Sequence, residues 1–463
     1  MSEAGASTEI VIVGGGLAGA AAAFEAANAG AEVLLLEKMA ETGGSSAMSG
    51  GCLAFAGTDL QAVNAVEDSS DLLMKDLIEV GQGENVKELV QAYVDNQHET
   101  YQWLKAAGTE FSPIVEASSG QSVPRVHTVD PADLVRLLIS RAKATGRARV
   151  LTSTPVSRLM SDAAQRVTGV AARLNGELVA FEARKAVILC SGGFSRNKDL
   201  IRRFVVGYDN ALIAGGEGNV GDGLKMGWSL GADFRDMPYI KGTFGKHPTD
   251  ETNVHSCQAV YKGAIAVNQD GKRFVDESIS YKLLGDACLR QPYGAAFQIL
   301  DQDIFEQGDN RVRILDFERR LEDGLMLKAD SLDELAEMID VPAEALKATV
   351  DEYNGFVSAG NDKAFGRKRL VHNHGALRRI ERAPFYAYPS TTVIFGTYCG
   401  LAVDREMQVR DVYGEAIDGL LAAGEVVGGL HGAAYMTGSA LGKAVIFGRL
   451  AARTAVARAA RAG

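Results

Sequence analysis

The sequence has few cysteines, and they are not arranged for a disulfide framework or a metal site. Cys52, Cys190, Cys257, Cys288 and Cys399 are scattered and odd in number, and no two form a C-x-x-C pair. A disulfide-stapled fold needs an even, closely spaced set, and zinc or iron–sulfur sites need clustered thiolates. The cysteine pattern therefore supports neither class, and we expect no metal.

Long apolar runs and an excess of basic residues are also absent. A membrane-spanning helix needs about eighteen apolar residues in succession, and no run approaches that length. Met1–Thr8 lacks the basic and apolar regions of a secretion signal. The net charge of −11 argues against a nucleic-acid partner, which requires a basic surface. We expect a cytoplasmic protein with no integral membrane segment and no nucleic-acid partner.

What the chain does have is the composition of an ordinary globular protein. Of its residues, 46% are hydrophobic and 23% are charged, which excludes the disordered and fibrous classes. A length of 463 residues is too great for one compact core. We therefore expect two domains, and the insertion of one into the other fits this length.

The most informative stretch begins with a strand followed by glycines. Ile10–Val13 is a β-branched run typical of a strand buried on both faces, and the sequence GGGLAG follows it directly. This matches G-x-G-x-x-G, in which Gly14 allows the tight turn and Gly16 lets the backbone approach a pyrophosphate. Gly19 lets the following helix pack closely on the strand. The pattern predicts the phosphate-binding turn of a dinucleotide site.

The residues that follow complete the same βαβ unit. Ala20–Ala29 is a run of small residues predicted to be a helix, and Val33–Leu36 is a second apolar strand. A helix N-terminus offers free N–H groups and a positive dipole end to the phosphates. Glu37, about twenty residues after the glycines, can accept both hydroxyls of an adenosine ribose. Strand, turn, helix, strand and acid are all in register, which favours a dinucleotide site over an ordinary turn.

Further small-residue segments are candidates for other walls of the same site. Gly43, Gly44, Ser45, Ser46, Gly50 and Gly51 form a loop that can wrap around a flat ligand, although a flexible surface loop is the alternative. The predicted strand Ala186–Cys190 ends in Ser-Gly-Gly-Phe, which includes Gly192, and Gly419–Glu425 is a strand that ends in Gly-Glu. Asp222 lies before a predicted helix as either a plain N-cap or a ligand contact.

The remaining patterns predict more elements. We expect a small antiparallel meander from strands at 150–152, 156–159, 167–174 and 178–183. The Gln269–Gly271 turn predicts a β-hairpin between 264–267 and 272–275. Helices are predicted at 331–339, 343–356 and 439–460.

Taken in order, GGGLAG with Glu37-Lys38, GGSSAMSGG, CSGGF, VGDG, LLAAGE and the ending GKAVIFGRLAA resemble the fumarate reductase/succinate dehydrogenase flavoprotein family. That family includes urocanate reductases and 3-ketosteroid dehydrogenases. The resemblance implies an α/β protein: a Rossmann-like FAD-binding domain, residues 1–241 and 397–463, interrupted by an inserted α+β capping domain, residues 242–396. The predicted FAD-binding residues are Gly14, Gly16, Ala18, Gly19, Glu37, Lys38, Gly43, Gly44, Ser45, Ser46, Gly50, Gly51, Val156, Gly192, Asp222, Glu425, Ser439, Ala440 and Leu441.

The resemblance also predicts how FAD is held. The succinate dehydrogenase branch attaches FAD covalently through a histidine near residues 43–51, but no histidine precedes His98 here. We therefore expect FAD to bind non-covalently. A helix that begins near Ser439 would direct its positive dipole end at the flavin pyrimidine and stabilise the anionic reduced form. No C-x-x-C-H haem motif occurs, so the electron donor or acceptor should be external.

Two residues match the catalytic residues of the fumarate reductases. In that family an arginine moves a proton while the flavin exchanges a hydride with one carbon of a C=C bond. The segment GKRFVDE places Arg273 at the position of this arginine, although an ion pair with Asp276 or Glu277 is the alternative. His247 matches a substrate-binding histidine.

Other positions depart from the fumarate reductase pattern. The Glu-x-x-Arg proton path aligns with Gln258–Tyr261, and glutamine cannot relay protons as glutamate does. A second substrate histidine aligns with Gly396, and the arginine of the HGANR segment aligns with Tyr435. Two groups that would hold a dicarboxylate are therefore missing, and an unpaired buried carboxylate is costly.

Tyr435 and the residues after it are more similar to the Tyr-x-x-Gly segment of 3-ketosteroid dehydrogenases, in which tyrosines polarise a ketone. Tyr398 could assist, with Tyr239, Tyr261 and Tyr388 as weaker candidates and His127 as another pocket candidate. The sequence thus favours an FAD-dependent enzyme that desaturates, or reduces, a C–C bond beside a carbonyl of a small-molecule ketone, cyclic or steroid-like. Alternatives are a fumarate- or urocanate-type carboxylate reductase, an amine oxidase, and a non-enzymatic scaffold.

Overall fold

The computed structural model describes residues 7–205, 207–208, 211–237, 239–249, 256–371 and 375–460. The chain divides into two compact units. Unit 1 contains the described residues up to Val205 together with Gly215–Ile240 and Gly396 onward. Unit 2 contains the described residues of 206–214 and Lys241–Phe395. Each unit is described by itself.

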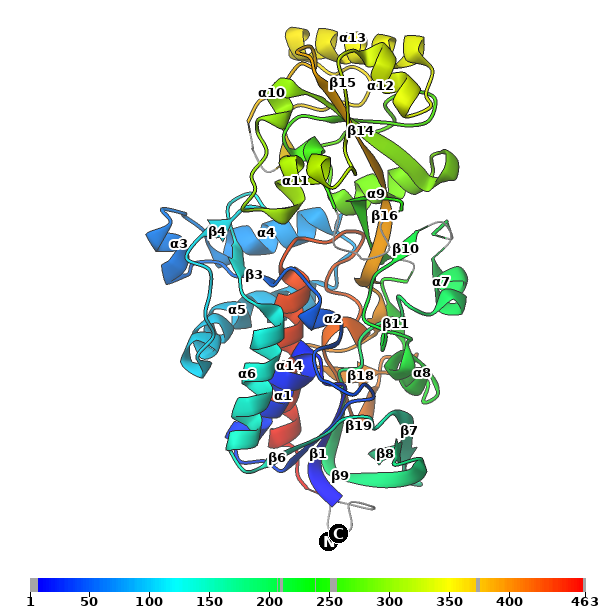
Figure 1. Cartoon of the computed structure of the whole chain (residues 1–463). Coiled ribbons are helices and arrows are strands. Elements are labelled where there is room, and N and C mark those ends of the chain that lie inside the picture. The colour runs from blue at the N-terminus through cyan, green and yellow to red at the C-terminus, as the bar shows by residue number, and fades with distance from the viewer. Residues whose placement is uncertain are drawn as a thin grey trace. The chain divides into compact units, whose positions relative to one another are not determined.

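A sheet of mainly parallel strands forms the centre of unit 1 (Figure 1). Its main path runs β18–β19–β9–β1–β2–β6, and the five strands from β19 to β6 are parallel. The six strands of this path are β1 (Ser7–Val13), β2 (Val33–Leu36), β6 (Ala148–Leu151), β9 (Glu177–Leu189), β18 (Gln408–Arg410) and β19 (Ala416–Ala422), of which β18 is antiparallel to β19. Val33–Leu36 is almost fully buried, as expected for a central parallel strand.

The register brings the carboxyl ends of the parallel strands to one edge of the sheet. Val13 of β1 pairs with Leu36 of β2 and with Leu189 of β9, and Leu189 also pairs with Ala422 of β19. The segments that follow these strands therefore meet at the same edge, where ligands bind in open α/β sheets.

Helices pack against one another beside this sheet. In unit 1, α1 (Leu17–Asn28) lies against both α6 (Pro131–Ala144) and α14 (Ser439–Ala457), as Figure 1 shows. A Cβ added at Gly448 would lie 2.4 Å from the carbonyl oxygen of Ala18. The α1–α14 crossing is therefore closer than any larger residue at position 448 would permit.

An antiparallel extension differs in part from the predicted meander. Strands β7 (Val156–Ser161) and β8 (Val167–Leu174) pair antiparallel with each other, and β8 pairs with β9. The strand predicted at 150–152 does not join them, because β6 pairs in parallel with β2. The strands predicted at 178–183 and 186–190 are a single strand, β9, which serves both the meander and the central sheet.

Other helices and strands complete unit 1. They are α2 (Gly44–Ala47), β3 (Cys52–Ala54), α3 (Asp59–Val63), α4 (Ser70–Val80), α5 (Lys87–Ala107), β4 (Val115–Glu116), β5 (Val126–Thr128), α7 (Lys198–Phe204), α8 (Asp222–Trp228), β11 (Phe234–Arg235) and β17 (Gly400–Leu401). Strands β3, β5 and β4 form a small antiparallel sheet, and β11 pairs antiparallel with β17.

Unit 2 is built around a six-stranded sheet whose long central strand is β16 (Phe385–Thr397). Its other strands are β10 (Leu212–Ile213), β12 (Ile240–Lys246), β13 (Ile265–Val267), β14 (Ala295–Asp301) and β15 (Leu327–Ala329). The longer helices are α9 (Tyr281–Leu289), α12 (Leu332–Met338) and α13 (Ala343–Ala359), with short helices α10 (Gln302–Phe305) and α11 (Phe317–Glu322). Residues of these elements enclose a separate hydrophobic core.

The hairpin predicted at 264–267 and 272–275 is wrong in its second strand. β13 pairs antiparallel with β14, and the 272–275 segment contributes only an isolated bridge between Val267 and Arg273. Asn268 closes the turn, because its side-chain oxygen accepts the N–H groups of Asp270 and Lys272. The periodicity of short apolar segments did not identify the strand partner.

Among the described residues, no helix combines the length and apolar character needed to cross a bilayer.

Candidate active site

The glycine turn after β1 is closed so tightly that larger residues do not fit. Gly14 has a φ of +109°, and a Cβ added there would lie 2.4 Å from the carbonyl oxygen of Cys190. A Cβ added at Gly19 would lie 1.9 Å from the carbonyl oxygen of Gly14. Gly16 occupies the N-cap position of α1 and has no side chain to cap the helix. The Leu17 N–H is bound by Ser46 Oγ, so the N–H groups after it in the first turn are the ones that can face an anion.

Glu37 follows β2 and is almost fully buried. Its Oε2 accepts the N–H of Gly15 at 2.6 Å, and its Oε1 accepts the N–H of Met39 at 2.8 Å. These two bonds hold the carboxylate beside the glycine turn. A carboxylate has about four lone-pair positions, so it can still accept the hydroxyls of a ribose.

The small-residue loop lies against the start of α1. Ser46 Oγ accepts the N–H of Leu17 at 3.2 Å, and Ser45 Oγ accepts the N–H of Gly216 at 3.0 Å. Both serines belong to the short helix α2, whose N-cap is Gly43 and whose first residue is Gly44. At the end of this loop, a Cβ added at Gly51 would lie 1.9 Å from the carbonyl oxygen of Val129. Gly50 precedes this tight contact.

Lys38 and Asp222 come from different elements and form an ion pair. Lys38 Nζ donates to Asp222 Oδ2 at 2.6 Å. Gly221 is the N-cap of α8, and Asp222 is the first helical residue. The plain N-cap alternative for Asp222 is therefore wrong by one position. Val156, another predicted FAD-binding residue, begins β7.

A polar cluster joins the ends of β9 and β19. Asn219 Nδ2 donates to Glu425 Oε1 at 2.9 Å, and the backbone N–H of Thr397 donates to the same oxygen at 2.8 Å. Asn219 is 3% exposed, and its Oδ1 has no partner among the described residues. A Cβ added at Gly192 would lie 3.0 Å from that oxygen. Sequence reasoning singled out Asp222 in this stretch and missed Asn219, although an amide among glycines was a usable signal.

Helix α14 begins without a side-chain cap. Gly438 is its N-cap in the left-handed region, with a φ of +90°. Ser439, Ala440 and Leu441 form the first turn, so their N–H groups carry the positive end of the helix dipole. The uncapped ends of α1 and α14, the buried Glu37 and the unpaired Asn219 oxygen together fit a dinucleotide with an anionic pyrophosphate and a polar flavin edge.

Three rings gather just before α14. The rings of Tyr398 and Tyr435 are stacked, with centroids 5.9 Å apart and an interplanar angle of 17°. His431 contacts both rings, with centroids 5.1 Å from Tyr398 and 5.5 Å from Tyr435. All three side chains are at most 4% exposed. The structure thus brings together two predicted catalytic residues and adds His431, for which the only sequence signal was its place at the start of HGAAY.

His127 lies on β5 in a buried aromatic cage. Its ring contacts Phe55, Tyr101 and Phe111, and its Nε2 lies 2.8 Å from Thr58 Oγ1. Burial lowers the pKa of His127 to about 4, so the ring is neutral near pH 7. These contacts show a core residue beside the N-cap of α3 and do not place His127 among the three rings.

Arg273 belongs to unit 2, where acidic and aromatic side chains surround it. Its guanidinium donates to Glu277 at 2.8 and 2.7 Å and to Asp362 at 3.0 Å. It also lies over the rings of Tyr353 and Phe365. Burial alone would lower the pKa of Arg273, but Glu277 and Asp362 outweigh burial and raise the pKa above its usual value. The arrangement resembles a buried structural ion pair.

His247, the other predicted catalytic residue in unit 2, is also buried. Its ring meets the ring of Tyr388 edge-on, with centroids 5.5 Å apart. Its Nδ1 lies 3.0 Å from Thr249 Oγ1. The described contacts of His247 and Arg273 share no residue.

Comparison with known proteins identifies the family. Residues 9–441 match the model of the FAD binding domain family. The chain is 30% identical to a probable fumarate reductase of Shewanella frigidimarina, covering 98% of this chain and 75% of that protein. It is also 30% identical to a urocanate reductase of Eggerthella lenta, covering 97% and 75%. The chain belongs to the fumarate reductase flavoprotein family.

A solved structure gives the same fold for this flavoprotein. The 3-ketosteroid-Δ4-(5α)-dehydrogenase of Rhodococcus jostii, in complex with 4-androstene-3,17-dione, is 26% identical, with a TM-score of 0.82. The alignment covers 99% of this chain and 98% of that one. The comparisons confirm the predicted family, the FAD cofactor and an oxidoreductase that acts on C=C or CH–CH groups.

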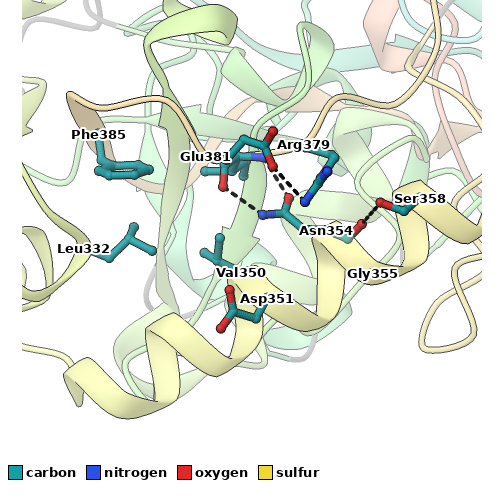
Figure 2. A pocket seen from close by; sticks show the side chains of 10 residues that line it. Leu332, Val350, Asp351, Asn354, Gly355, Ser358, Arg379, Glu381 and Phe385 are labelled. Carbon is teal, nitrogen blue, oxygen red and sulfur yellow. Dashed lines mark hydrogen bonds and ion pairs between the residues drawn. The ribbon is translucent and has the colours of Figure 1, made fainter.

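Figure 2 shows a separate cavity in unit 2 of the flavoprotein, with a volume of about 460 Å³. The Asn354 amide exchanges two hydrogen bonds with the backbone of Ile380, each 2.8 Å long. Arg379 forms an ion pair with Glu381 at 2.8 Å. Dashed lines in Figure 2 mark interactions of this kind among the residues that line the cavity. None of the predicted site residues lines this cavity, so we assign no catalytic role to it.

Proposed function

We propose that the protein is an FAD-dependent oxidoreductase acting on the C–C bond α,β to the carbonyl of an uncharged ketone, cyclic or steroid-like. In this proposal Tyr435 polarises the carbonyl, and Tyr398 supports the Tyr435 ring. The family supplies the FAD chemistry and the action on C=C bonds. The ketone substrate is the more specific part of the proposal, and the ring cluster before α14 supports it.

The stacked tyrosines are the observation that carries the ketone proposal. Tyr435 is buried, and its phenolic oxygen accepts the N–H of Gly438 at 3.0 Å. That N–H and the start of α14 bring positive dipole ends toward the phenol oxygen, which stabilises partial negative charge on it. A buried phenol O–H in such a setting can donate to a carbonyl oxygen as negative charge develops there.

The backbone at Gly396 supports the same proposal. Resemblance to fumarate reductases places a substrate-binding histidine at this position. A Cβ added at Gly396 would lie 2.7 Å from Glu425 Oε1, and Glu425 is already held by Asn219 and Thr397. A histidine there would have to displace the Glu425 carboxylate. Without a cation at positions 396 and 435, a dicarboxylate would lose two of its expected partners.

FAD, when bound, exchanges a hydride with one carbon of the substrate bond. The residues that would hold it non-covalently are Glu37 for the ribose, the start of α1 for the pyrophosphate, and the start of α14 for the flavin edge. A hydride and a proton convert C=C to CH–CH, so the protein must also supply or remove one proton. Arg273 and the tyrosines are the candidates for that proton, and the ion pairs of Arg273 favour a tyrosine.

A second candidate is a reductase of an unsaturated carboxylate. It is supported by the names of two relatives, a probable fumarate reductase and a urocanate reductase. Its local support is His247, which matches a substrate-binding histidine of that family. A carboxylate substrate would then need cations other than the two that are missing at positions 396 and 435.

We also propose the assignment of the chain segments. Residues 1–241 and 397–463 build the Rossmann-like FAD-binding domain, supported by the parallel sheet and the glycine turn within them. Residues 242–396 build the inserted α+β capping domain. Electrons are exchanged with an external partner in the cytoplasm. An oxidation assay with reduced viologen and with NADH as alternative donors would identify the type of partner.

The deciding experiment follows the visible flavin spectrum of the purified holoprotein without oxygen. The oxidised flavin is titrated with cyclohexanone and, separately, with succinate. The chemically reduced flavin is then offered 2-cyclohexen-1-one, 4-androstene-3,17-dione, fumarate and urocanate. Bleaching or reoxidation by the ketones alone supports the proposal. Reoxidation by fumarate or urocanate alone rejects it in favour of the carboxylate reductase.

A further inference from the structure

His431 is the member of the ring cluster to which no role has been assigned. It is 2% exposed and contacts both tyrosine rings. Its Nδ1 lies 3.3 Å from Ser439 Oγ, at the first residue of α14. The imidazole therefore connects the tyrosine pair to the helix whose N-terminus would face the flavin.

The hydroxyl of Ser439 determines which ring nitrogen of His431 carries the proton. Ser439 Oγ donates to the carbonyl oxygen of Met436 at 2.7 Å. A serine hydroxyl has a single proton to donate, so it cannot also donate to His431. The contact between them requires an N–H on Nδ1. In the neutral ring the acceptor lone pair is then on Nε2.

The backbone on both sides of His431 is fixed by hydrogen bonds. Asp236 Oδ2 accepts the N–H of Gly429 at 2.8 Å and the N–H of Gly432 at 3.2 Å. Asp236 itself has a φ of +62°, which is unusual for a residue other than glycine. The Asp236 carboxylate therefore holds the chain two residues before and one residue after His431.

The turn between α4 and α5 also forms hydrogen bonds with the backbone around His431. The N–H of Val86 donates to the carbonyl oxygen of Gly429 at 2.7 Å, and Asn85 Nδ2 donates to that of Leu430 at 2.7 Å. The N–H of Ala433 donates to the carbonyl oxygen of Gly81 at 3.1 Å. Such pairing of the loop backbone on both sides of a residue is expected where its side chain must be held in one position.

We propose that His431, fixed as the Nδ1–H tautomer by Ser439, is a positioning residue that orients the Tyr398–Tyr435 pair toward the substrate carbonyl. The inference rests on the proposed function of Tyr435. It assigns His431 no contact with substrate or flavin. Its effect on turnover passes through the phenol of Tyr435.

The first test compares three substitutions at His431. His431→Asn can place an amide N–H near the Nδ1 position, His431→Gln places one near Nε2, and His431→Phe retains a ring without either nitrogen. Each holoprotein is assayed with the probe that the wild type turns over. Misplacement of a reacting group by about 1 Å costs about 100-fold in rate. We expect that loss in kcat for His431→Phe, a similar loss for His431→Gln, and recovery to within about tenfold of wild type for His431→Asn.

Other measurements separate positioning from a merely structural role. KM, FAD content and the thermal midpoint should change little in His431→Phe. His98→Asn, a substitution at an exposed site on α5, is the matched control and should leave kcat unchanged. Equal kcat for wild type and His431→Phe overturns the proposal. A loss of kcat that only follows lost FAD or lost stability also overturns it.

The second test needs no substrate. Nitrogen-15 NMR of the histidine-labelled holoprotein distinguishes Nδ1–H from Nε2–H rings, and the His431→Asn spectrum assigns the signal. We expect a protonated Nδ1 in the wild type and a loss of that preference in Ser439→Ala. A protonated Nε2 in the wild type overturns the proposal. If the wild type turns over no ketone, the proposed function fails while this test still decides the tautomer.

Discussion

Lys38 Nζ lies 2.6 Å from Asp222 Oδ2, although the two residues are 184 positions apart. Lys38 follows β2, directly after the ribose-binding candidate Glu37, and Asp222 begins α8. The sequence singled out both residues as FAD-binding candidates for separate reasons. Their contact links the segment after β2 to the start of α8.

Removing either member of this pair should weaken FAD retention. Lys38 and Asp222 are partly exposed, at 24% and 35%, so the pair itself contributes only about 0.2–1 kcal/mol to folding stability. We expect Lys38→Ala and Asp222→Ala each to release FAD more readily. The double variant should bind FAD no more weakly than whichever single variant binds it less tightly. Ultrafiltration with flavin fluorescence measures the dissociation constant. Arg311→Ala, which breaks an exposed ion pair with Asp309, is the control.

Two Gly→Ala substitutions, one at the glycine turn and one in α13, should have opposite effects on stability. Gly19→Ala would place a Cβ 1.9 Å from the Gly14 carbonyl oxygen, so the turn or α1 must shift. We expect Gly19→Ala to lose FAD and to unfold at lower denaturant. Gly355 in α13 has no atom within 4 Å of an added Cβ, and Gly355→Ala should stabilise the protein by about 0.5–1 kcal/mol. Denaturant unfolding with the flavin signal tests both; equal stabilities would contradict the close packing at Gly19.

His127 should make the fold sensitive to mild acid. Its pKa is about 4 in the folded protein, against a usual value of 6.5. Between these pH values the unfolded chain binds more protons, so stability falls as the pH falls from 6.5 toward 4. We expect a loss of about 2 kcal/mol between pH 7 and pH 5.

The His127 contribution is measured against a matched variant. Guanidinium unfolding at pH 7 and pH 5 should show a smaller difference for His127→Gln than for wild type. His98→Gln, at an exposed position, should retain the wild-type difference. An unchanged difference in His127→Gln would show that other groups cause the acid sensitivity.

Arg273→Ala distinguishes a structural arginine from a proton-transferring one. The substitution removes the buried ion pairs of Arg273 with Glu277 and Asp362, and of its ion pairs within the described residues Glu277 keeps only the one with Arg367 at 3.2 Å. Breaking a buried ion pair from one side typically costs about 3–5 kcal/mol, so we expect a large loss of stability. If the variant instead retains wild-type stability and FAD but turns over nothing, Arg273 is the proton-transferring residue.

Tyr435→Phe tests the proposed carbonyl polariser. The substitution preserves the stack with Tyr398 and removes the phenol O–H. Loss of one such donor at a developing oxyanion costs about 100- to 1,000-fold in kcat, with FAD content unchanged. Tyr413→Phe, at a site that is 87% exposed, is the control and should have no effect. Wild-type kcat in Tyr435→Phe would remove this residue from the mechanism.

The sequence predicted the local parts of the cofactor site because they depend on neighbouring residues. In the βαβ unit, the turn glycines, helix and acid lie within one short segment, and hydrogen bonds join Glu37 to Gly15 and to Met39. Backbone sterics and strand direction determine such a unit with little contribution from the rest of the chain. The family and its FAD cofactor could be predicted for the same reason.

Strand partners and long-range contacts were decided only by the tertiary structure. The apolar pattern predicted strands near 150 and 265, but β6 pairs with β2 and β13 pairs with β14. For Arg273 the alternative to a catalytic role was an ion pair with Asp276 or Glu277, and the arginine contacts Glu277 together with the distant Asp362.

The ring cluster shows the same division between sequence and structure. The sequence singled out Tyr398 and Tyr435 as separate tyrosines, while their stacking and the contact with His431 depend on how the segment before α14 packs. Hydrophobic periodicity specifies which face of an element is buried, but not which element covers that face. By itself, the sequence therefore determined the βαβ turn, the family and the FAD cofactor. The packing of distant segments decided the Asn219–Glu425 bond and the surroundings of Tyr435, because contacts across long loops depend on the whole core.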